Sequence, residues 1–443
     1  MKFKRLFGAA LLGTGLVAGL ASCGGIDDAH TITFYHTMGD NLRSVLTEAT
    51  TKFHEDHPEW QVSDTQVGNY DAVKEACIAD LQAGTQPSLA YCYADHVAEY
   101  LTTGKVLDMN QFINDPTIGF SSEKVADFIP GYYDEGRQFG DTSKMYTLPF
   151  SKSTEVVYYN NTVCKELGIE VKNDWTWDDF WAACAKVKAS SKYSKWFPMG
   201  YDSEANWFIT YCEQAGLGYT SATEPHYLFN NEGTKAWLTS LKENYGKGYF
   251  TTQTINGSYT SNLFTKQRIK EDGTDNSANI VSCVFSIGST GGASHQTSEE
   301  FEVGIAPIPR VAGKDLKVIS QGPNVCMFDQ DNEEKAKMTW EFVSKYLMEP
   351  VFQAKFSMAS GYMPVLKSAL QLADYQAWLS DEDNIIAQTS AVAASLVDSY
   401  YTSPAFRGSS TARTQVGNAL IAAITGTKSI DDALKDAYDE CNF

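Results

Sequence analysis

Two short motifs carry residue types that could do chemistry. The Gly-Ser-Thr-Gly-Gly run at residues 288–292 offers a serine hydroxyl beside flexible backbone, but it lacks the Gly-x-Ser-x-Gly spacing of a nucleophile elbow. His54 and His57 lie three positions apart, whereas a zinc-binding His-Glu-x-x-His helix spaces its histidines by four. The sequence contains neither a phosphate-binding loop nor a dinucleotide fingerprint. It therefore predicts no catalytic centre, no metal site and no cofactor.

Tyrosine and tryptophan are abundant, with 24 and 9 copies. Tyr70, Tyr93 and Tyr362 lie at the ends of expected segments, and Trp207 lies in an expected turn over residues 204–207. Aromatic faces stack on sugar rings, and phenol hydroxyls hydrogen-bond to ligand oxygens. We therefore expect a binding site for a polar small molecule, while core packing is the alternative explanation for each single ring.

The N-terminal residues predict export. A short basic start precedes an apolar stretch over residues 6–20, as in a secretory signal peptide. The Leu-Ala-Ser-Cys sequence that ends at Cys23 resembles the lipobox of bacterial lipoproteins. We expect residues 1–22 to be removed, Cys23 to carry a membrane-anchoring lipid, and residues 23–29 to form a tether. A plain membrane helix with a chance cysteine is the alternative. The expected location is outside the cytoplasm, either lipid-anchored to the cell membrane or in the periplasm.

Bulk composition predicts a large globular protein. The chain has 443 residues, of which 43% are hydrophobic, so two or three lobes are expected. A net charge of −20 argues against binding to nucleic acid. Eight cysteines besides Cys23 are widely spaced, so we expect mostly buried free thiols and leave one or two disulfides open. We expect a monomer that binds a small solute.

Hydrophobic periodicity predicts an α/β fold. Strand patterns at residues 31–35, 60–66 and 89–93 alternate with helical stripes, which is typical of an open and largely parallel sheet. Residues 177–270 are expected to be mainly helical. Residues 148–159 indicate an extended crossing between lobes. The expected first lobe is residues 30–148 plus 300–345, and the expected second lobe is residues 149–299 plus 346–443.

Several segments together resemble the extracellular solute-binding proteins of ABC importers, in the maltose and glycerol-phosphate group. The resemblance implies a two-lobed fold of the type II periplasmic-binding-protein class, with a ligand cleft between the lobes. It also implies delivery of the solute to a membrane permease. The implied solutes are a sugar, a polyol, glycerol-3-phosphate or a related glycerophosphodiester. The segments that carry the resemblance are residues 31–38, 68–70, 148–160, 166–169, 174–180, 306–309 and 360–364.

The same resemblance implies the residues that contact the ligand. Two positions stay open, because Thr290 competes with Ser289 and Arg413 competes with Arg407. The placement of Ser153 is open by one position. The contacts carried over from the family are Tyr70, Ser153, Ser289, Gly322, Tyr362 and Arg407. We add Asp95 and, as a stacking face proposed from its own expected turn, Trp207.

Asp95 is the departure from the family pattern. The family's glutamate falls on Ala94, so the neighbouring Asp95 is expected to take its place with a shorter reach. Carboxylate and hydroxyl groups supply the paired acceptors and donors that a polyol needs, and an arginine would supply a charge for a phosphate. Two other classes remain as alternatives, namely an exported carbohydrate-active enzyme and a surface carbohydrate-binding adhesin.

Overall fold

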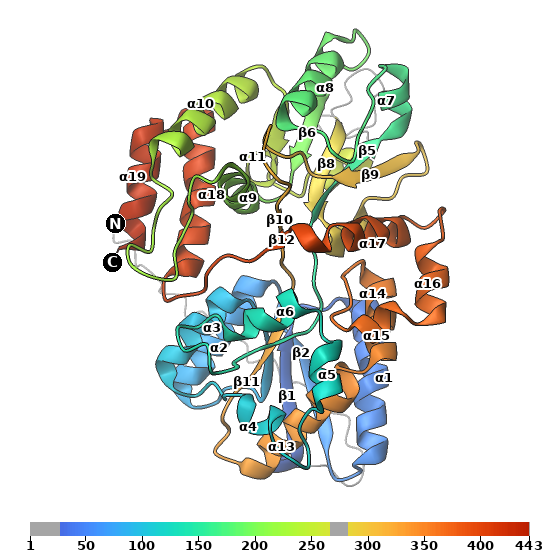
Figure 1. The fold of residues 1–443 in the computed structure, drawn as a ribbon, viewed down its shortest axis with the longest axis vertical. Helices are drawn as coiled ribbons and strands as arrows, with labels where there is room; N and C mark the ends of the chain where they lie inside the picture. The colour runs from blue at the N-terminus through green and yellow to red at the C-terminus, as the bar shows by residue number, and fades with distance from the viewer. Residues whose placement is uncertain (1–26, 266–281, 443) are drawn as a thin grey trace, which may run out of the picture.

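The computed structural model describes residues 27–265 and 282–442, which form two lobes stacked along the long axis of the molecule (Figure 1). Each lobe contains a five-stranded sheet flanked by helices. This is the expected two-lobed α/β fold. The predicted signal peptide, residues 1–22, and Cys23 lie outside the described residues.

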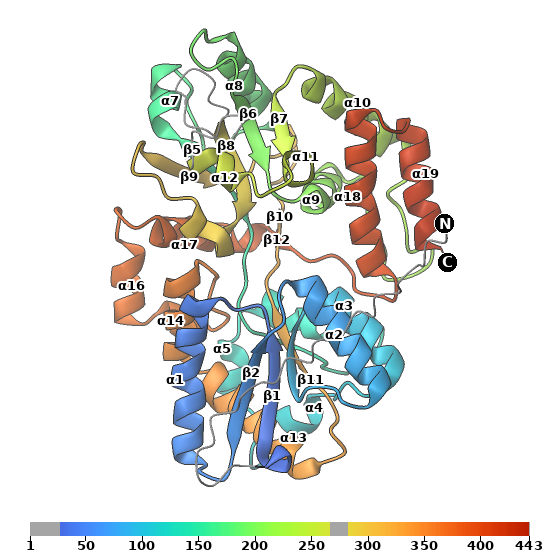
Figure 2. The ribbon, with the colours of Figure 1, turned by 180° about the vertical axis from the view of Figure 1, so that it is seen from behind.

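The first lobe is a sheet with the strand order β2-β1-β3-β11-β4. β2 and β3 run parallel to β1, which lies between them, whereas β11 runs antiparallel to β3. The chain goes from β1 to β2 on one side and then crosses back to β3 on the other side of β1. Because such parallel crossovers are right-handed, the connecting helices α1 and α2 lie on opposite faces of the sheet. Figure 2 shows α1 on one side of this sheet and α2 and α3 on the other. The elements are β1 (Thr31–His36), α1 (Asp40–Asp56), β2 (Gln61–Gln66), α2 (Tyr70–Ala83), β3 (Leu89–Cys92), α3 (Ala94–Tyr100), β4 (Leu148–Pro149) and β11 (Asn324–Met327).

The two faces of the first sheet have separate hydrophobic cores. Val73, Cys77 and Leu81 recur every four residues along α2 and therefore share one helix face. They pack with Cys92 and Cys326 in a cluster distinct from the core under α1. All eight cysteines of the described residues are free and buried, as the sequence predicted for most of them.

The second lobe contains a sheet with the order β7-β6-β8-β5-β9. The segment expected to be mainly helical, residues 177–270, therefore contains two strands that the sequence analysis missed. Both are short and almost entirely buried, so they lack the alternation that marks a half-exposed strand. The strands are β5 (Glu155–Asn160), β6 (Phe197–Tyr201), β7 (Phe250–Thr252), β8 (Cys283–Ser289) and β9 (Val303–Pro307).

The chain returns to the first lobe later than the sequence predicted. β9 lies in the segment 300–345 that was assigned to the first lobe, yet it pairs with β5 along the second sheet. Phe352, Phe356 and Leu366 come from the segment assigned to the second lobe, yet they lie in the core of the first. Periodicity identifies a strand or a helix but does not identify its partner. From these contacts we propose a first lobe of residues 28–149 plus 324–370.

Three segments run side by side between the lobes. Isolated backbone bridges join Lys152 to Met363 and Ser153 to Gln321. Lys152 is fully buried, and its ammonium group pairs with the Glu135 carboxylate of the first lobe. The crossing expected within residues 148–159 is therefore present. The segments that contain Gln321 and Met363 pack against it.

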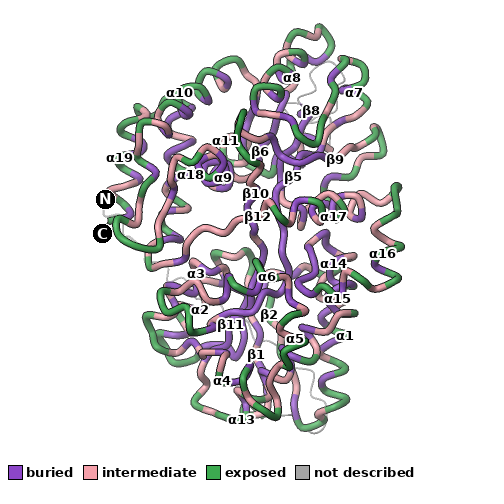
Figure 3. The backbone as a smooth tube through the Cα atoms, viewed as in Figure 1, coloured by how far each residue is buried: buried purple, intermediate pink, exposed green. Residues whose placement is uncertain are grey.

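The remaining helices pack around the two sheets, and Figure 3 shows that many of them have an exposed side. Within the part of the chain that the structure describes, no helix combines the length and apolar character needed to cross a membrane. These helices are α4 (Asn110–Ile113), α5 (Ser122–Asp127), α6 (Pro130–Asp134), α7 (Asn161–Glu166), α8 (Trp177–Ala189), α9 (Glu204–Ala215), α10 (Glu232–Gly246), α11 (Gln253–Asn256), α12 (Ser261–Thr265), α13 (Glu333–Glu341), α14 (Pro350–Ser360), α15 (Lys367–Leu370), α16 (Ala373–Leu379), α17 (Ile385–Ser395), α18 (Ser409–Thr425) and α19 (Ile430–Cys441).

Candidate functional site

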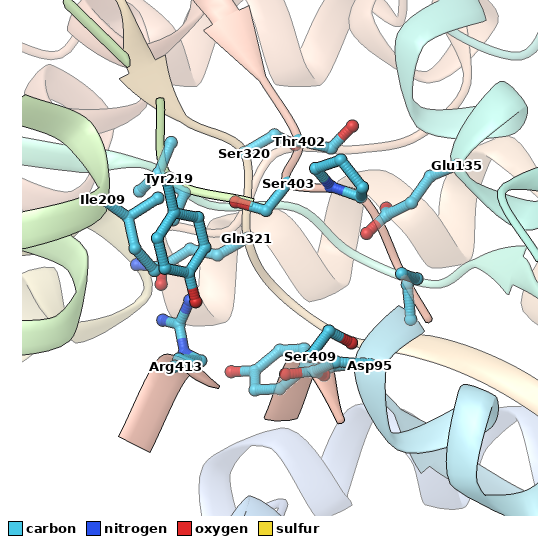
Figure 4. Close-up of a pocket in the computed structure, with 15 residues that line it drawn as sticks. Asp95, Glu135, Ile209, Tyr219, Ser320, Gln321, Thr402, Ser403, Ser409 and Arg413 are labelled. Atoms are coloured by element: carbon cyan, nitrogen blue, oxygen red, sulfur yellow. The ribbon is translucent and has the colours of Figure 1, made fainter. Parts of the chain in front are cut away.

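A cleft of about 1050 Å³ lies between the lobes and is lined by side chains from both. A smaller chamber of about 70 Å³ adjoins it, and Tyr93, Asp95, Gln321 and Arg413 line both spaces. Figure 4 shows the Arg413 side chain extending toward Tyr219 and Gln321 in this chamber. Small-molecule sites usually measure about 300–1000 Å³. The cleft is therefore large enough for a solute of several sugar rings or for a smaller molecule with water.

The first lobe contributes the starts of two helices to the cleft. The Asn69 side chain accepts a hydrogen bond from the Ala72 amide at 2.9 Å and fixes the start of α2 at Tyr70. The Tyr70 ring stacks on Tyr93 with centroids 4.4 Å apart. Asp95 lies in the first turn of α3, directly after β3. These side chains come together because β2 and β3 both run parallel to β1, which lies between them, so their carboxyl ends lie at the same edge of the sheet.

Tyr362 joins this group from the loop after α14. Its hydroxyl lies 3.3 Å from the Tyr70 hydroxyl. Its ring lies against Gly291 of the second lobe, where a Cβ atom would come within 2.6 Å of the ring. Gly361 has a positive φ of 84°, and a Cβ there would lie 2.4 Å from the Thr290 carbonyl oxygen. Two glycines therefore allow Tyr362 to reach the cleft.

Of the serine, threonine and glycine candidates, only the serines line the cleft. Ser289 lines the cleft, whereas Thr290 is fully buried and its hydroxyl accepts from the Thr154 amide at 3.3 Å. Ser153 also lines the cleft. Gly322 is not among the lining residues. It has a φ of 103°, and a Cβ there would lie 2.5 Å from the backbone of the first crossing segment, so this position requires glycine for packing.

The arginine that lines the cleft is Arg413 and not Arg407. Arg407 is exposed and lies outside both spaces, whereas Arg413 projects into them from α18. The first lobe meets the start of the same helix, where the Glu99 carboxylate accepts from the Gly408 amide at 3.0 Å. Among the described residues that line the cleft, Arg413 is the only arginine or lysine.

A buried hydrogen-bond network surrounds Arg413. Its guanidinium donates to Asn206 Oδ1, and Asn206 Nδ2 donates to Glu155 Oε1 and to Gln321 Oε1, each at 2.9 Å. The Tyr201 hydroxyl donates to Glu155 Oε2 at 2.7 Å. Burial raises the pKa of Glu155 to about 7, although the donors from Tyr201 and Asn206 and the Arg413 charge oppose this rise.

Trp207 does not face the cleft. Residues 204–207 form the first turn of α9 and not an open turn, since the Ser203 side chain caps the Asn206 amide. The Trp207 ring is 1% exposed and stacks on Tyr201 at 4.7 Å inside the second core. Neighbouring residues of a helix point about 100° apart, so Asn206 faces the cleft and Trp207 faces the core.

Several lining residues were missed by the sequence analysis. Glu155, Asn206 and Gln321 belong to the network, Asp202 lines the cleft beside it, and Tyr259 lines the cleft with 59% of its surface exposed. The Ser203 cap was the available signal for the helix start that places Asn206. Across residues 27–265 and 282–442, no three histidine, cysteine or acidic side chains cluster as metal ligands would.

Comparison with known sequences identifies the family of the chain. The sequence profile of bacterial extracellular solute-binding proteins matches residues 48–380, about three quarters of the chain. The chain belongs to this family. It is similar to the sn-glycerol-3-phosphate-binding periplasmic protein UgpB of Escherichia coli K12, with 25% identity over 372 residues that cover 81% of this chain and 79% of the relative. UgpB of Yersinia pestis bv. Antiqua is 23% identical over 354 residues, which cover 78% and 76%.

Several solved structures share the fold. UgpB from Mycobacterium tuberculosis, in complex with glycerophosphocholine, superposes with a TM-score of 0.75 at 16% identity and covers 93% of this chain and 97% of its own. The cyclic alpha-maltosyl-1,6-maltose binding protein from Arthrobacter globiformis gives 0.71 at 17% identity and covers 93% and 98%. The GacH receptor of Streptomyces glaucescens, known with acarbose, gives 0.71 at 14% identity and covers 92% and 96%. The type II two-lobed fold predicted from the sequence is therefore confirmed.

Proposed function

We propose that this protein is the substrate-binding component of an ABC importer that captures a carbohydrate-class solute and delivers it to a membrane permease. The observation that carries this proposal is the cleft, which takes its walls from both lobes and collects hydroxyl, carboxylate, amide and aromatic groups. A solute held by both walls would favour the closed arrangement, because only that arrangement makes both sets of contacts.

The two walls offer different chemistry to the solute. Tyr70 and Asp95 of the first lobe, with Tyr362, supply phenol and carboxylate groups that suit sugar or glycerol hydroxyls. Ser153 and Ser289 add hydroxyls. In the second lobe, Arg413 supplies a positive charge for a phosphate group. The proposed solutes are a sugar, glycerol-3-phosphate or a glycerophosphodiester, the last two being suggested also by the names of the related UgpB proteins.

Calorimetry with glycerol-3-phosphate, glycerophosphocholine and maltose tests the proposal. A charge-assisted hydrogen bond contributes about 1.5–3 kcal/mol, so Arg413→Ala should weaken a phosphorylated solute by roughly tenfold to a hundredfold. Arg407→Ala is the matched control, because this exposed arginine lies outside the cleft. Small-angle scattering should show compaction when a bound solute is present. Binding of none of a broad panel of sugars, polyols and their phosphates would contradict the proposal.

The same panel separates binding from catalysis. We infer a binding protein and not an enzyme, so a bound sugar should be recovered unchanged after long incubation. Release of shorter sugars from an oligosaccharide would favour the carbohydrate-active enzyme instead. Binding to immobilised polysaccharide without capture of any monomeric solute would favour the adhesin.

We also propose that Cys23 is the lipidated N-terminus of an exported monomer. The support is the sequence Leu-Ala-Ser-Cys after an apolar stretch, together with membership of an extracellular family. Cys23→Ser should release the protein from the membrane fraction, and mass spectrometry of the wild type should show an acylated cysteine. Membrane retention of the Cys23→Ser protein, with no acyl group on the wild type, would contradict the anchor. Light scattering on the released protein measures its oligomeric state.

A further inference from the structure

Glu155 is an ionisable side chain enclosed at the wall of the ligand cleft. It stands at the start of β5, where the first crossing segment enters the second lobe, and only 1% of its surface is exposed. Both carboxylate oxygens have protein donors, the Tyr201 hydroxyl at 2.7 Å and Asn206 Nδ2 at 2.9 Å. A buried carboxylate is costly unless a positive charge compensates it.

The compensating charge is connected to it by a single amide. Asn206 donates through Nδ2 to Glu155 and accepts through Oδ1 from the Arg413 guanidinium. Its second Nδ2 bond, to Gln321, attaches the same amide to a crossing segment. The amide orientation is therefore fixed by three partners, and Asn206 positions Arg413 at the cleft wall. No other arginine or lysine lines the described part of the cleft.

We infer that Glu155 is the proton-linked counter-charge of Arg413, and that the cleft takes up a proton on Glu155 when an anionic solute group binds Arg413. The inference rests on the proposed function and specifies how the site responds to a charged solute. The proton comes from solvent, and no covalent bond of the solute changes.

The charges that face Glu155 explain the coupling. Burial raises its pKa to about 7, and the Arg413 charge favours the ionised form, whereas Asp202, which directly follows β6, disfavours it. The two titratable hydroxyls near it, those of Tyr201 and Tyr401, keep pKa values well above the usual tyrosine value because both are buried. A phosphate on Arg413 would cancel the favourable charge and bring a negative one near. The pKa of Glu155 would then rise further, so binding would draw in a proton.

The network can hold both protonation states with no movement of heavy atoms, if the Tyr201 hydroxyl hydrogen turns away from the carboxyl group. When Glu155 is ionised, Tyr201 and Asn206 both donate to it. When Glu155 is protonated on Oε2, its own hydroxyl can donate to the Tyr201 oxygen while Asn206 still donates to Oε1. The proton therefore has a place to bind that leaves Arg413 in position.

The sign of the pH dependence follows from this arrangement. Above the pKa of the bound state Glu155 is ionised with or without solute, and below about pH 7 it already carries the proton in the free protein. Affinity for an anionic solute should therefore rise as the pH falls from about 9 toward 7 and then level off. A pKa increase of one unit on binding corresponds to a tenfold gain in affinity across this range.

Calorimetry with glycerophosphoglycerol and maltose tests the inference. A phosphodiester is used because the second pKa of a phosphate monoester, about 6, would add its own protonation. Titrations at pH 7 in buffers of different ionisation enthalpy should show fractional proton uptake with glycerophosphoglycerol and none with maltose. Glu155→Gln should abolish the uptake and flatten the pH dependence. Glu213→Gln, which changes an exposed residue of the same helix as Asn206, is the control and should retain both.

Three other results of these titrations would contradict the inference. Saturable binding of glycerophosphoglycerol without proton uptake, or the same uptake in Glu155→Gln, would overturn the inference. Binding of maltose alone would also overturn it, because the site would then take no anion, while the proposed function would stand.

A second measurement needs no solute. Infrared difference titration of wild type against Glu155→Gln reports the protonation of this carboxyl directly. We expect a titration near neutrality that moves to higher pH in Arg413→Gln, since that variant removes the favourable charge. Titration near the usual value of 4.5, or the same pKa in both backgrounds, would overturn the charge pair even if neither probe binds.

Discussion

Replacing Glu155 with glutamine should stabilise the folded protein above neutral pH. The folded-state pKa of Glu155, about 7, lies above its unfolded value near 4.5 because the side chain is buried. Such a group contributes its full stability below the unfolded pKa and loses it as the pH rises through the folded pKa. At 1.36 kcal/mol per pKa unit, wild type should lose about 1.4 kcal/mol by pH 5.5 and about 3 kcal/mol by pH 8. Glutamine stays neutral and avoids this loss.

The advantage of Glu155→Gln should therefore grow by about 2 kcal/mol between pH 5.5 and pH 8. Glutamine can accept from one former donor and donate to the Tyr201 oxygen, so the network keeps partners for its polar atoms. Denaturant unfolding followed by tryptophan fluorescence measures the difference at each pH. For a lobe of about 200 residues, 2 kcal/mol corresponds to roughly 4–8 °C in melting temperature.

The control for this experiment is Glu213→Gln, an exposed change on α9. It should alter stability by less than about 0.5 kcal/mol at every pH. A Glu155→Gln protein that is less stable than wild type at pH 8 would refute the reasoning, because ionised Glu155 would then be a net stabilising group. A stability difference that does not change with pH would refute it as well.

Three other substitutions probe the crossing, the cleft wall and the contact between the lobes. Lys152→Met should leave the Glu135 carboxylate buried without its partner and lower the free energy of unfolding by about 3–5 kcal/mol; a loss below about 1 kcal/mol in thermal unfolding would contradict this. Gly291→Ala should displace the Tyr362 ring and weaken solute binding while leaving the circular dichroism spectrum unchanged; unchanged affinity would show that the ring makes no contact with the solute. Glu99→Gln removes a carboxylate from the positive end of α18, an interaction of about 0.3–1 kcal/mol, so affinity should fall by roughly twofold to fivefold at low salt, and the difference from wild type should shrink at high salt because salt screens this interaction; equal affinity at low salt would mean that this contact does not hold the lobes.

The first sheet was predictable because its signals are local. The strands predicted over 31–35, 60–66 and 89–93 differ from the observed β1, β2 and β3 by a residue at their ends. β6 and β7 were missed because strands buried on both faces lose the alternation that reveals them. The lobe boundary failed for a different reason, since the pairing of β9 with β5 is a contact between distant segments that periodicity does not report.

The residues of the candidate site also divide into those that the sequence indicates and those that only the fold identifies. Tyr70 and Asp95 follow strands of the first sheet, and a family resemblance was enough to point to them. Arg407 was expected in the cleft, but the helix that enters the cleft begins only at Ser409, so the inward-facing arginine is Arg413. Distinguishing the two needs the helix phase, which depends on packing against the rest of the second lobe.

The position of the network also bears on how the protein would select solutes. Glu155, Asn206 and Arg413 all belong to the second lobe and are bonded to one another there. The proposed charge-sensitive end of the cleft therefore lies within one lobe, whereas Tyr70 and Asp95 line the cleft from the other lobe. It follows that changes in the second-lobe network should alter the preference between charged and neutral solutes. Changes at the first-lobe wall should instead affect every solute that needs both walls.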